Sequence, residues 1–323
     1  MSPSNAARVI VFGECLVDRF GEQSIAGGAP FNVARHLAAL GLAPVFVTRV
    51  GDDGPGRQLR AELARFGLGE DALQIDPLRP TGQVRVHERD GHHDFEILPD
   101  QAYDHIEARD WAGWAAADGE PLPWITFGTL GQRHAHSRAA LAALRAAVPH
   151  RACVDVNWRT GQVGRDVVAA TLAGANVLKL NAEELALLLR WQSLASLHAA
   201  RPPAPGTGCA AIAALLAPTR VAQLIVTYGA AGYALWERDG SCRLRGTGLA
   251  APAIVDTVGA GDAFCAITLA GCALSWPWEI TLSRANAFAA AICGVRGAAP
   301  AGLEFYERWK VQWGLSGAAP RSA

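Results

Sequence analysis

Short apolar runs alternate with segments of helical periodicity along most of this chain. The runs are rich in β-branched and apolar residues, which indicates strands buried on both faces, and apolar residues recur at helical spacing in the segments between them. Alternation of this kind is typical of a mostly parallel sheet covered by helices on both sides. The sequence therefore predicts an α/β fold that binds ligands at the carboxyl ends of its strands. The expected strands are Val9–Phe12, Val45–Val47, Trp124–Phe127, Ala152–Val156, Val177–Lys179 and Leu224–Thr227, and the expected helices are Phe31–Leu40, Arg57–Phe66, Ser137–Ala147, Asp166–Ala173, Ala182–Arg190 and Ala263–Leu274.

One segment, Gln83–Leu98, departs from this rhythm because polar and apolar residues alternate in it around Asp90-Gly91. Alternation at period two around Asp-Gly is a hairpin signature. Together with Leu16–Ile25, this hairpin predicts a small sheet that stands off the main domain. We expect a lid over a binding site, built from about 15–27 and 83–100, and the alternative is an edge hairpin without a function.

Size and composition narrow the class of protein. The 323 residues are 50% apolar and 18% charged, and no internal break is visible, so we expect one domain over 1–314 and a disordered tail at 315–323. A net charge of −1 without long charged runs argues against nucleic-acid and membrane-surface partners. Seven cysteines without a C-x-x-C pair indicate neither a disulfide framework nor a zinc site, which favours the cytoplasm. The first apolar run is too short for a signal peptide, and no run is long enough to span a membrane.

The segment Asp256–Asp262 (Asp-Thr-Val-Gly-Ala-Gly-Asp) is the most informative site candidate. The first turn of a helix has unpaired N–H groups and partial positive charge, and the small residues Gly259, Ala260 and Gly261 let an anion approach them. A carboxylate beside a bound anion is unfavourable unless it has a task, such as taking a proton from an attacking hydroxyl. The alternative is an ordinary helix N-cap, because Asp is a favoured capping residue. We interpret Asp262 as a base that also caps the helix.

A second cluster, Ala26–Ala34, contains Gly27 and Gly28 ahead of Asn32 at the start of a helix. A glycine pair permits close approach of the backbone to a ligand, and an asparagine amide offers both a donor and an acceptor to a polyol hydroxyl. Asp18, a little upstream, is able to accept hydrogen bonds from two sugar hydroxyls. A tight turn with a helix cap, and a surface Asp, explain the same residues without a ligand.

A third cluster, Asn181 with Glu184, lies at a strand-to-helix junction. Asn as N-cap with Glu at the third helical position resembles a capping box. The functional alternative is that both side chains hold water around Mg²⁺, which keeps several waters and few protein ligands.

Two further strand ends carry candidate residues. Asp155, Asn157 and Arg159 follow one strand, where the arginine is able to clamp a phosphate, and the turn Thr227–Gly232 follows another and resembles a nucleotide-contacting turn. The chain lacks a P-loop, a G-x-G-x-x-G after the first strand, a G-x-S-x-G elbow and an H-E-x-x-H. These absences disfavour P-loop enzymes, dehydrogenases, serine hydrolases and zinc proteases.

Taken in order, these clusters resemble the signatures of the ribokinase-like (PfkB) carbohydrate kinases, from Val9 to about Gly297. The glycine pair with Asn32 and Leu40-Gly41 looks like the N-terminal signature, and Val50–Gly56 resembles the next block. Asn181-x-x-Glu184 resembles the magnesium motif, and Asp256–Asp262 resembles the C-terminal signature, which is the most specific. The resemblance implies a ribokinase-like three-layer α/β/α fold with a mostly parallel sheet and a small β lid.

The resemblance also implies roles for individual residues. Asp262 would be the catalytic base that activates a sugar hydroxyl for attack on the γ-phosphate of ATP, and the amides of Gly259, Ala260 and Gly261 would form the anion hole. The cofactors implied are ATP, Mg²⁺ and, in some members, a monovalent cation such as K⁺, and members often pair as homodimers through the lid. The remaining assignments are Asp18, Gly27, Gly28, Asn32 and Arg159 for the sugar; Lys179, Asn181, Thr227, Gly229, Gly232 and Asn286 for the nucleotide; Asn181 and Glu184 for water-mediated Mg²⁺; and Asp256 with Val258 for the monovalent cation.

The sugar is expected to be fructose. Gly13-Glu14 ahead of Asp18 and the Asp155-x-Asn157-x-Arg159 segment look most like fructokinases, and Leu16 stands where ribokinases carry an Asn. The 2-keto-3-deoxygluconate kinases share much of this pattern and are the rival prediction. Two other classes stay open: a sugar or nucleotide sensor that kept the fold without the chemistry, and a structural protein.

Overall fold

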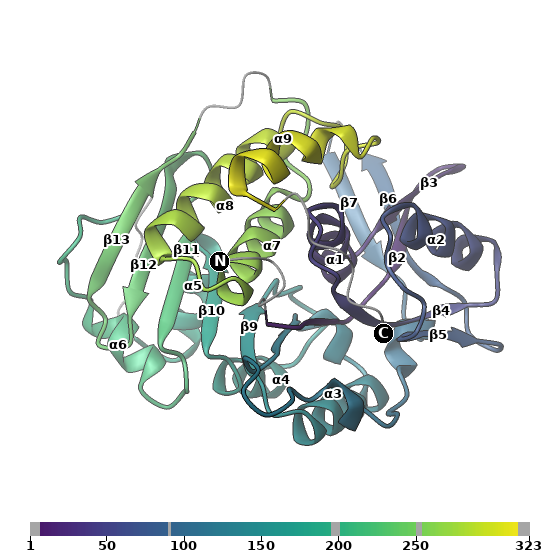
Figure 1. Ribbon diagram of the computed structural model, residues 1–323, viewed down its shortest axis with the longest axis horizontal. Coiled ribbons are helices and arrows are strands. Elements are labelled where there is room, and N and C mark those ends of the chain that lie inside the picture. The colour runs from purple at the N-terminus through teal and green to yellow at the C-terminus, as the bar shows by residue number, and fades with distance from the viewer. Residues whose placement is uncertain (1–6, 90–91, 195–200, 250–253, 316–323) are drawn as a thin grey trace.

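A nine-stranded sheet forms the centre of the molecule in the computed structural model, which describes residues 7–89, 92–194, 201–249 and 254–315 (Figure 1). Its strand order is β13-β12-β11-β10-β9-β8-β1-β4-β5, and the strands from β11 to β5 run parallel. The strands are β1 Val9–Phe12, β4 Val45–Gly51, β5 Leu73–Asp76, β8 Trp124–Phe127, β9 Arg151–Asp155, β10 Val177–Asn181, β11 Gln223–Thr227, β12 Gly232–Glu237 and β13 Cys242–Thr247.

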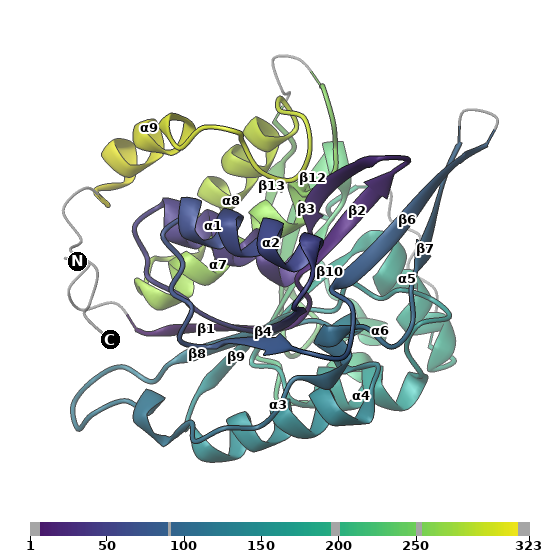
Figure 2. The same ribbon diagram turned by 90° about the vertical axis from the view of Figure 1, so that its right-hand side faces the viewer.

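Helices cover both faces of this sheet, as Figure 2 shows with α1, α2, α7 and α8 on one side and α3 and α4 on the other. Alternate residues of one strand serve the two sides: Val9 and Val11 pack in one core with α1 and α7, whereas Ile10 and Phe12 pack in the other with α3. The predicted three-layer α/β/α fold is confirmed. The helices are α1 Ala29–Ala39, α2 Gly54–Arg65, α3 Ala135–Ala147, α4 Arg165–Ala173, α5 Ala182–Trp191, α6 Ala210–Leu216, α7 Ala260–Ala273, α8 Trp278–Ile292 and α9 Glu304–Trp313.

The sequence did not predict the antiparallel edge formed by β12 and β13. In β13 buried or half-buried positions alternate with exposed ones, which is the pattern of an edge strand. The parallel strands that were predicted are buried along nearly their whole length and therefore give a stronger sequence signal.

A second sheet of four strands stands off the main body, beside α2 in Figure 2. Its strands are β2 Leu16–Phe20, β3 Gln23–Gly27, β6 Gly82–Arg89 and β7 His92–Ile97, in the order β3-β2-β6-β7. The small sheet predicted from the alternating segments is thus present, and the Asp90-Gly91 turn of its hairpin lies outside the described residues. Of the expected tail at 315–323, Leu315 is buried in the core, and 316–323 lie outside the described residues. Among the described helices, none has the length and apolar character needed to cross a membrane.

Candidate active site

A pocket opens where the carboxyl ends of β1, β8 and β9 meet the first turn of α7. Its volume is about 370 Å³ when the open solvent at its mouth is included. Three acidic side chains line it, from three separate elements: Glu14 after β1, Asp155 at the end of β9 and Asp262 in α7. The other lining residues are Ala29, Pro30, Val33, Thr126, Phe127, Gly128, Thr129, Leu130, Asn157 and Cys265.

The carboxylate of Asp262 is joined to the sugar-site candidate Asn32. The Asn32 Nδ2 donates a hydrogen bond of 2.6 Å to Asp262 Oδ2, and the guanidinium of Arg35 donates to Asn32 Oδ1. Arg35 is buried, with its guanidinium 4.5 Å from the centre of the Phe31 ring. Because Arg35 occupies the amide oxygen, the amide N–H of Asn32 faces Asp262.

Asp262 does not cap its helix, so this part of the sequence interpretation is wrong. Gly259 occupies the N-cap position with φ +78°, and no side chain caps α7. Asp262 is the third residue of the helix, and its carboxylate turns towards Asn32 instead of the helix N–H groups. The helix start is therefore left without a side-chain acceptor, as an anion site requires.

The pKa of Asp262 is raised from its ordinary 3.8 to about 6. Removal from water is the largest cause, and the nearby Asp155 adds to it, whereas the Asn32 hydrogen bond, Lys179 and Arg159 act in the opposite direction. A carboxylate with a pKa of about 6 is mostly ionised at neutral pH and is a better proton acceptor than a solvated one.

Glu14 is a buried acid that the sequence analysis used only as a family marker. Burial raises its pKa to about 7, against the lowering effects of its own backbone hydrogen bond and of Arg159. Its Oε2 atom is buried and has no hydrogen-bond partner in the structure. The sequence does carry a signal for Glu14: the residue lies directly after the first predicted strand, and parallel sheets bind ligands at the carboxyl ends of their strands.

Lys179 and Asp155 form an ion pair beside the helix start. They are direct register partners on the neighbouring strands β10 and β9, and Lys179 Nζ lies 2.6 Å from Asp155 Oδ2. Burial opposes the charge on Lys179, but the Asp155 carboxylate raises the pKa of the ammonium above its usual value. A Cβ atom placed on Gly261 would lie 3.3 Å from Lys179 Nζ, so the ammonium is next to the glycine-rich loop.

The Asn181–Glu184 pair forms the capping box that its spacing indicates. Asn181 Oδ1 accepts from the Glu184 N–H, and Glu184 Oε2 accepts from the Asn181 N–H, both at 2.8 Å. Glu184 Oε1 also accepts from the Trp158 N–H at 2.8 Å, which ties the segment after β9 to α5. The carboxylate is mostly buried, and burial followed by the charge of Asp155 raises its pKa.

The other sugar-site candidates gather near the base of the small sheet. Asp18 touches Gly27, because a Cβ atom on Gly27 would lie 2.5 Å from Asp18 Oδ2. Gly28 has φ +107°, and a Cβ there would meet the Glu14 carbonyl oxygen at 2.6 Å. Burial raises the pKa of Asp18 to about 6, opposed by Arg159 and then Arg35. Arg159 is exposed and acts on Glu14, Asp18 and Asp262 alike.

The nucleotide-site candidates do not line this pocket. Thr227 ends β11 and donates a 3.4 Å hydrogen bond to the Leu180 carbonyl, whereas Gly229 has open space around it. Gly232 begins β12 with φ +108°, and a Cβ on it would lie 2.0 Å from the Gly246 carbonyl, so its role in the structure is close strand packing. Asn286 Nδ2 donates to the Thr247 carbonyl at 2.9 Å, joining α8 to β13.

The loop before α7 is held by Asp256. Its Oδ1 accepts from the Val258 N–H and its Oδ2 from the Gly297 N–H, each at 3.0 Å. The carboxylate therefore links the glycine-rich loop to the segment after α8.

Comparison with known proteins identifies the family of this chain. Residues 7–304 match the pfkB family of carbohydrate kinases. The chain belongs to this family. It is 32% identical to a fructokinase of Klebsiella pneumoniae over 286 residues, which are 82% of this chain and 84% of that protein. It is 30% identical over 289 residues to the bifunctional protein HldE of a Bradyrhizobium species, covering 84% of this chain and 53% of that longer protein.

Solved structures share the fold. A fructokinase with bound ATP from Xylella fastidiosa superposes with a TM-score of 0.74 at 22% identity, over 95% of this chain and 98% of that one. A Vibrio cholerae fructokinase in a fructose-, ADP- and calcium-bound form gives 0.70 at 23% identity, over 91% and 95%. Family membership and the fructokinase relatives make this pfkB-family chain a phosphotransferase that acts on a sugar hydroxyl.

Proposed function

We propose that this chain transfers the γ-phosphate of ATP to a hydroxyl of D-fructose, giving fructose 6-phosphate, with Asp262 as the general base. The observation that carries the proposal is the position of Asp262, which lies in the pocket at the start of α7 and is hydrogen-bonded to Asn32. One carboxylate thus lies between a polar side chain suited to a sugar and a helix start suited to a phosphate. The fructokinase relatives support fructose as the acceptor.

The mechanism assigns separate tasks to the two sides of Asp262. Asp18, Gly27, Gly28, Asn32 and Arg159 hold the sugar, and Asp262 Oδ2 accepts the proton of the attacking hydroxyl. The N–H groups of Gly259, Ala260 and Gly261 stabilise the phosphoryl oxygens, and Lys179 adds a positive charge next to Gly261. Catalysis then comes mostly from positioning and charge neutralisation, as phosphoryl transfer requires.

The residues present fit a magnesium ion. Asp155, Asn181 and Glu184 supply carboxylate and amide oxygens, and Asp155 Oδ1 is buried without a hydrogen-bond partner. Asn181 and Glu184 already bond each other's backbone, so they would hold the ion through water. Such an ion, when bound, neutralises charge on the phosphates of ATP. We place the nucleotide along Lys179, Asn181, Thr227, Gly229, Gly232 and Asn286, and we keep Asp256 and the Val258 carbonyl as candidates for a monovalent cation.

The charge of the pocket favours a neutral sugar over a sugar acid. Glu14 and Asp262 line the pocket, Asp18 is a further acidic sugar-site candidate, and Arg159 is the positive neighbour that all three share. A carboxylate substrate such as 2-keto-3-deoxygluconate would meet like charges there, which disfavours its binding. We also propose that the four-stranded sheet closes over the sugar as a lid and that two copies pair through it.

A phosphorylation screen tests the acceptor. Purified protein with MgATP is offered fructose, 2-keto-3-deoxygluconate, ribose, tagatose and nucleosides, and ADP release is followed with a coupled assay. We expect fructose to give the highest kcat/KM. Selective turnover of ribose or of the sugar acid would overturn the fructose assignment while leaving the kinase assignment intact, whereas ligand-induced thermal stabilisation without ADP release would support a sensor.

The fall of kcat/KM at acidic pH, the acid limb of the pH profile, tests which carboxylate is the base. Asp262 must be ionised to accept a proton, and its pKa is about 6, so we expect kcat/KM to fall by about tenfold per pH unit well below pH 6 and to level off above it. Glu14, whose pKa is about 7, is the competing candidate in the same pocket. The limb should persist in Glu14→Gln; its disappearance there would transfer the role of base to Glu14.

Two glycines of the anion loop should respond differently to substitution. Gly261→Val places side-chain atoms against Lys179 Nζ, so we expect a higher KM for ATP and slower turnover. Because Gly261 is exposed and helical, we expect little change in melting temperature. Gly259→Ala forces φ +78° on alanine and puts its Cβ 2.5 Å from Ala298 Cα, so we expect a loss of at least about 1–2 kcal/mol of stability. Unchanged kinetics in Gly261→Val would make the loop purely structural.

A further inference from the structure

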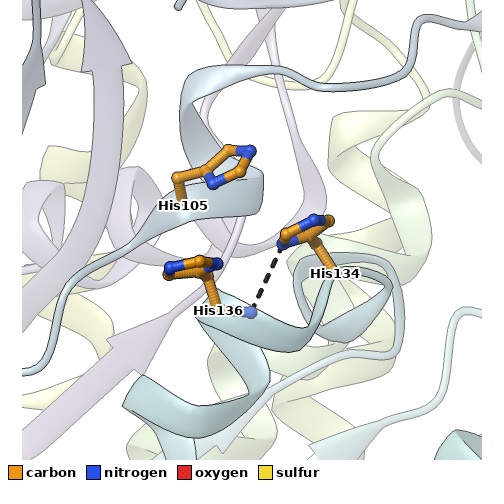
Figure 3. Close-up of side chains that lie close together, drawn as sticks. All are labelled: His105, His134 and His136. Atoms are coloured by element: carbon orange, nitrogen blue, oxygen red, sulfur yellow. Dashed lines mark hydrogen bonds between the residues drawn. The ribbon is translucent and has the colours of Figure 1, made fainter.

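Three histidines from two segments meet on the side of the molecule where the small sheet returns to the main body. His105 ends the short 3-10 helix η2 (Ala102–His105), and His134 and His136 lie at the start of α3. One ring nitrogen from each lies within 4.8 Å of those of the other two, and within the described residues this is the sole group of three or more such side chains. Figure 3 shows the His105 imidazole facing the other two rings across a small gap.

The surroundings of His105 resemble those of a metal-binding histidine. Its Nε2 lies 2.6 Å from Asp100 Oδ1, and this contact leaves Nδ1 for a further ligand. Metal-bound histidines almost always give their second nitrogen to a carboxylate or carbonyl, which fixes the orientation of the ring. Asp100 holds this position with φ +50°, a conformation that Asp tolerates better than most residues.

The other two rings are weakly engaged, because the one hydrogen bond that involves the His134 lone pair is long. His134 Nδ1 accepts a single long hydrogen bond, 3.3 Å, from the His136 N–H, drawn as the dashed line in Figure 3. His105 is buried, His134 half-buried and His136 exposed, so the cluster has a fixed inner side and an outer side open to solvent. An entering ion therefore has a path, and water is available for a fourth coordination position.

We propose that His105, His134 and His136 bind one divalent transition-metal ion of the zinc type, outside the kinase pocket. Three imidazoles suit Zn²⁺, Ni²⁺ or Cu²⁺ and not Mg²⁺, which prefers oxygen ligands. Tetrahedral ligands about 2.0–2.1 Å from zinc lie about 3.4 Å apart, so the rings must move closer by roughly an ångström. The exposed His136 can make that movement by side-chain rotation.

The ion would reinforce a connection that Arg133 already makes. Arg133 donates to the Leu98 carbonyl at 2.6 Å and to both carboxylate oxygens of Asp104, and so joins the segment after β7 to the start of α3. His105 and His134 belong to the same two segments. Metal binding would therefore link the segment after β7 to the start of α3 a second time, and so stabilise the folded protein.

Titration of chelator-treated, buffer-exchanged protein with zinc chloride tests the site by calorimetry and thermal shift. We expect one zinc ion per chain and a raised melting temperature, both lost in His136→Ala and in His134→Ala. Because His136 is exposed, its replacement leaves the fold intact. The double variant His92→Ala/His93→Ala, which removes two histidines of the β7 hairpin strand, should bind zinc as the unchanged protein does.

A second variant tests the role of the carboxylate. Asp100→Asn keeps the shape and the tolerance of positive φ but removes the charge, so zinc binding should weaken by about 10- to 100-fold. Cobalt(II) should give the strong visible absorption of a tetrahedral nitrogen site. Absence of stoichiometric binding, binding unchanged by His136→Ala, or cobalt–thiolate absorption from cysteine ligands would each overturn the proposal and leave the three imidazoles as a stacking contact.

Discussion

Asp262→Asn is expected to lower kcat by about 10² to 10⁴ while the protein stays folded and still binds ATP. Asparagine cannot accept the hydroxyl proton, but its amide oxygen can keep the 2.6 Å hydrogen bond from Asn32 Nδ2. The anion loop and the Lys179–Asp155 pair are untouched by the change. Steady-state kinetics with saturating sugar and MgATP give the loss, and ATP titration calorimetry gives the retained affinity.

Asp166→Asn is the matched control for this variant. Asp166 lies in the first turn of α4, as Asp262 lies in the first turn of α7, but it is exposed and does not line the pocket. Its loss should leave kcat unchanged. Near-normal turnover in Asp262→Asn would refute the base assignment, and a drop of equal size in both variants would show that helix stability, not proton transfer, is being measured.

Lys179→Met is expected to affect stability and activity together. The side chains of Lys179 and Asp155 are 7% and 14% exposed, so removal of the ammonium leaves a carboxylate nearly buried without its partner. Breaking a buried pair in this way costs about 3–5 kcal/mol of the free energy of unfolding. Turnover should also fall because the positive charge beside Gly261 is lost. Urea denaturation and coupled kinetics measure the two effects.

A double variant separates these two effects. Asp155→Leu combined with Lys179→Met removes both charges, and replacing a buried pair with apolar residues is often neutral for stability. We therefore expect most of the unfolding free energy to return while turnover stays low, because the charge of Lys179 and the Asp155 oxygen that we place at the magnesium ion are both absent. Recovery of turnover would mean that Lys179 serves only the fold. Lys310→Met, which breaks an exposed pair with Glu307, should cost no more than about 1 kcal/mol.

The sequence predicted the sheet and its helices well because their signal is local. Each buried parallel strand is a short apolar run, and each covering helix carries its own periodicity, so neighbouring residues are sufficient to recognise them. The small sheet was recognised from alternation around Asp90-Gly91 for the same reason. The edge strands β5 and β13 lack a continuous apolar run and were missed, and β12 was missed although its residues 233–236 form such a run.

The contacts inside the site could not be predicted in this way. Asn32 and Asp262 are 230 positions apart, and their hydrogen bond depends on how α1 packs beside α7. The buried Arg35 that orients Asn32 looked like an ordinary helix residue. The pairing of Lys179 with Asp155 follows from strand register, which the sequence does not specify. The histidine cluster likewise depends on the path of the chain between β7 and α3.

The hydrogen bond from Asn32 to Asp262 has a consequence for the protein when sugar is scarce. A kinase that binds ATP with a free base beside the γ-phosphate risks activating water and hydrolysing its nucleotide. Here one of the two carboxylate oxygens, Asp262 Oδ2, already holds the Asn32 N–H, so an entering water finds fewer acceptor positions than at a free carboxylate. A sugar hydroxyl that binds Asn32 draws the amide away and takes its place at the carboxylate. On the proposed mechanism, the Asn32 amide that binds the sugar also slows the hydrolysis of ATP by water when no sugar is bound.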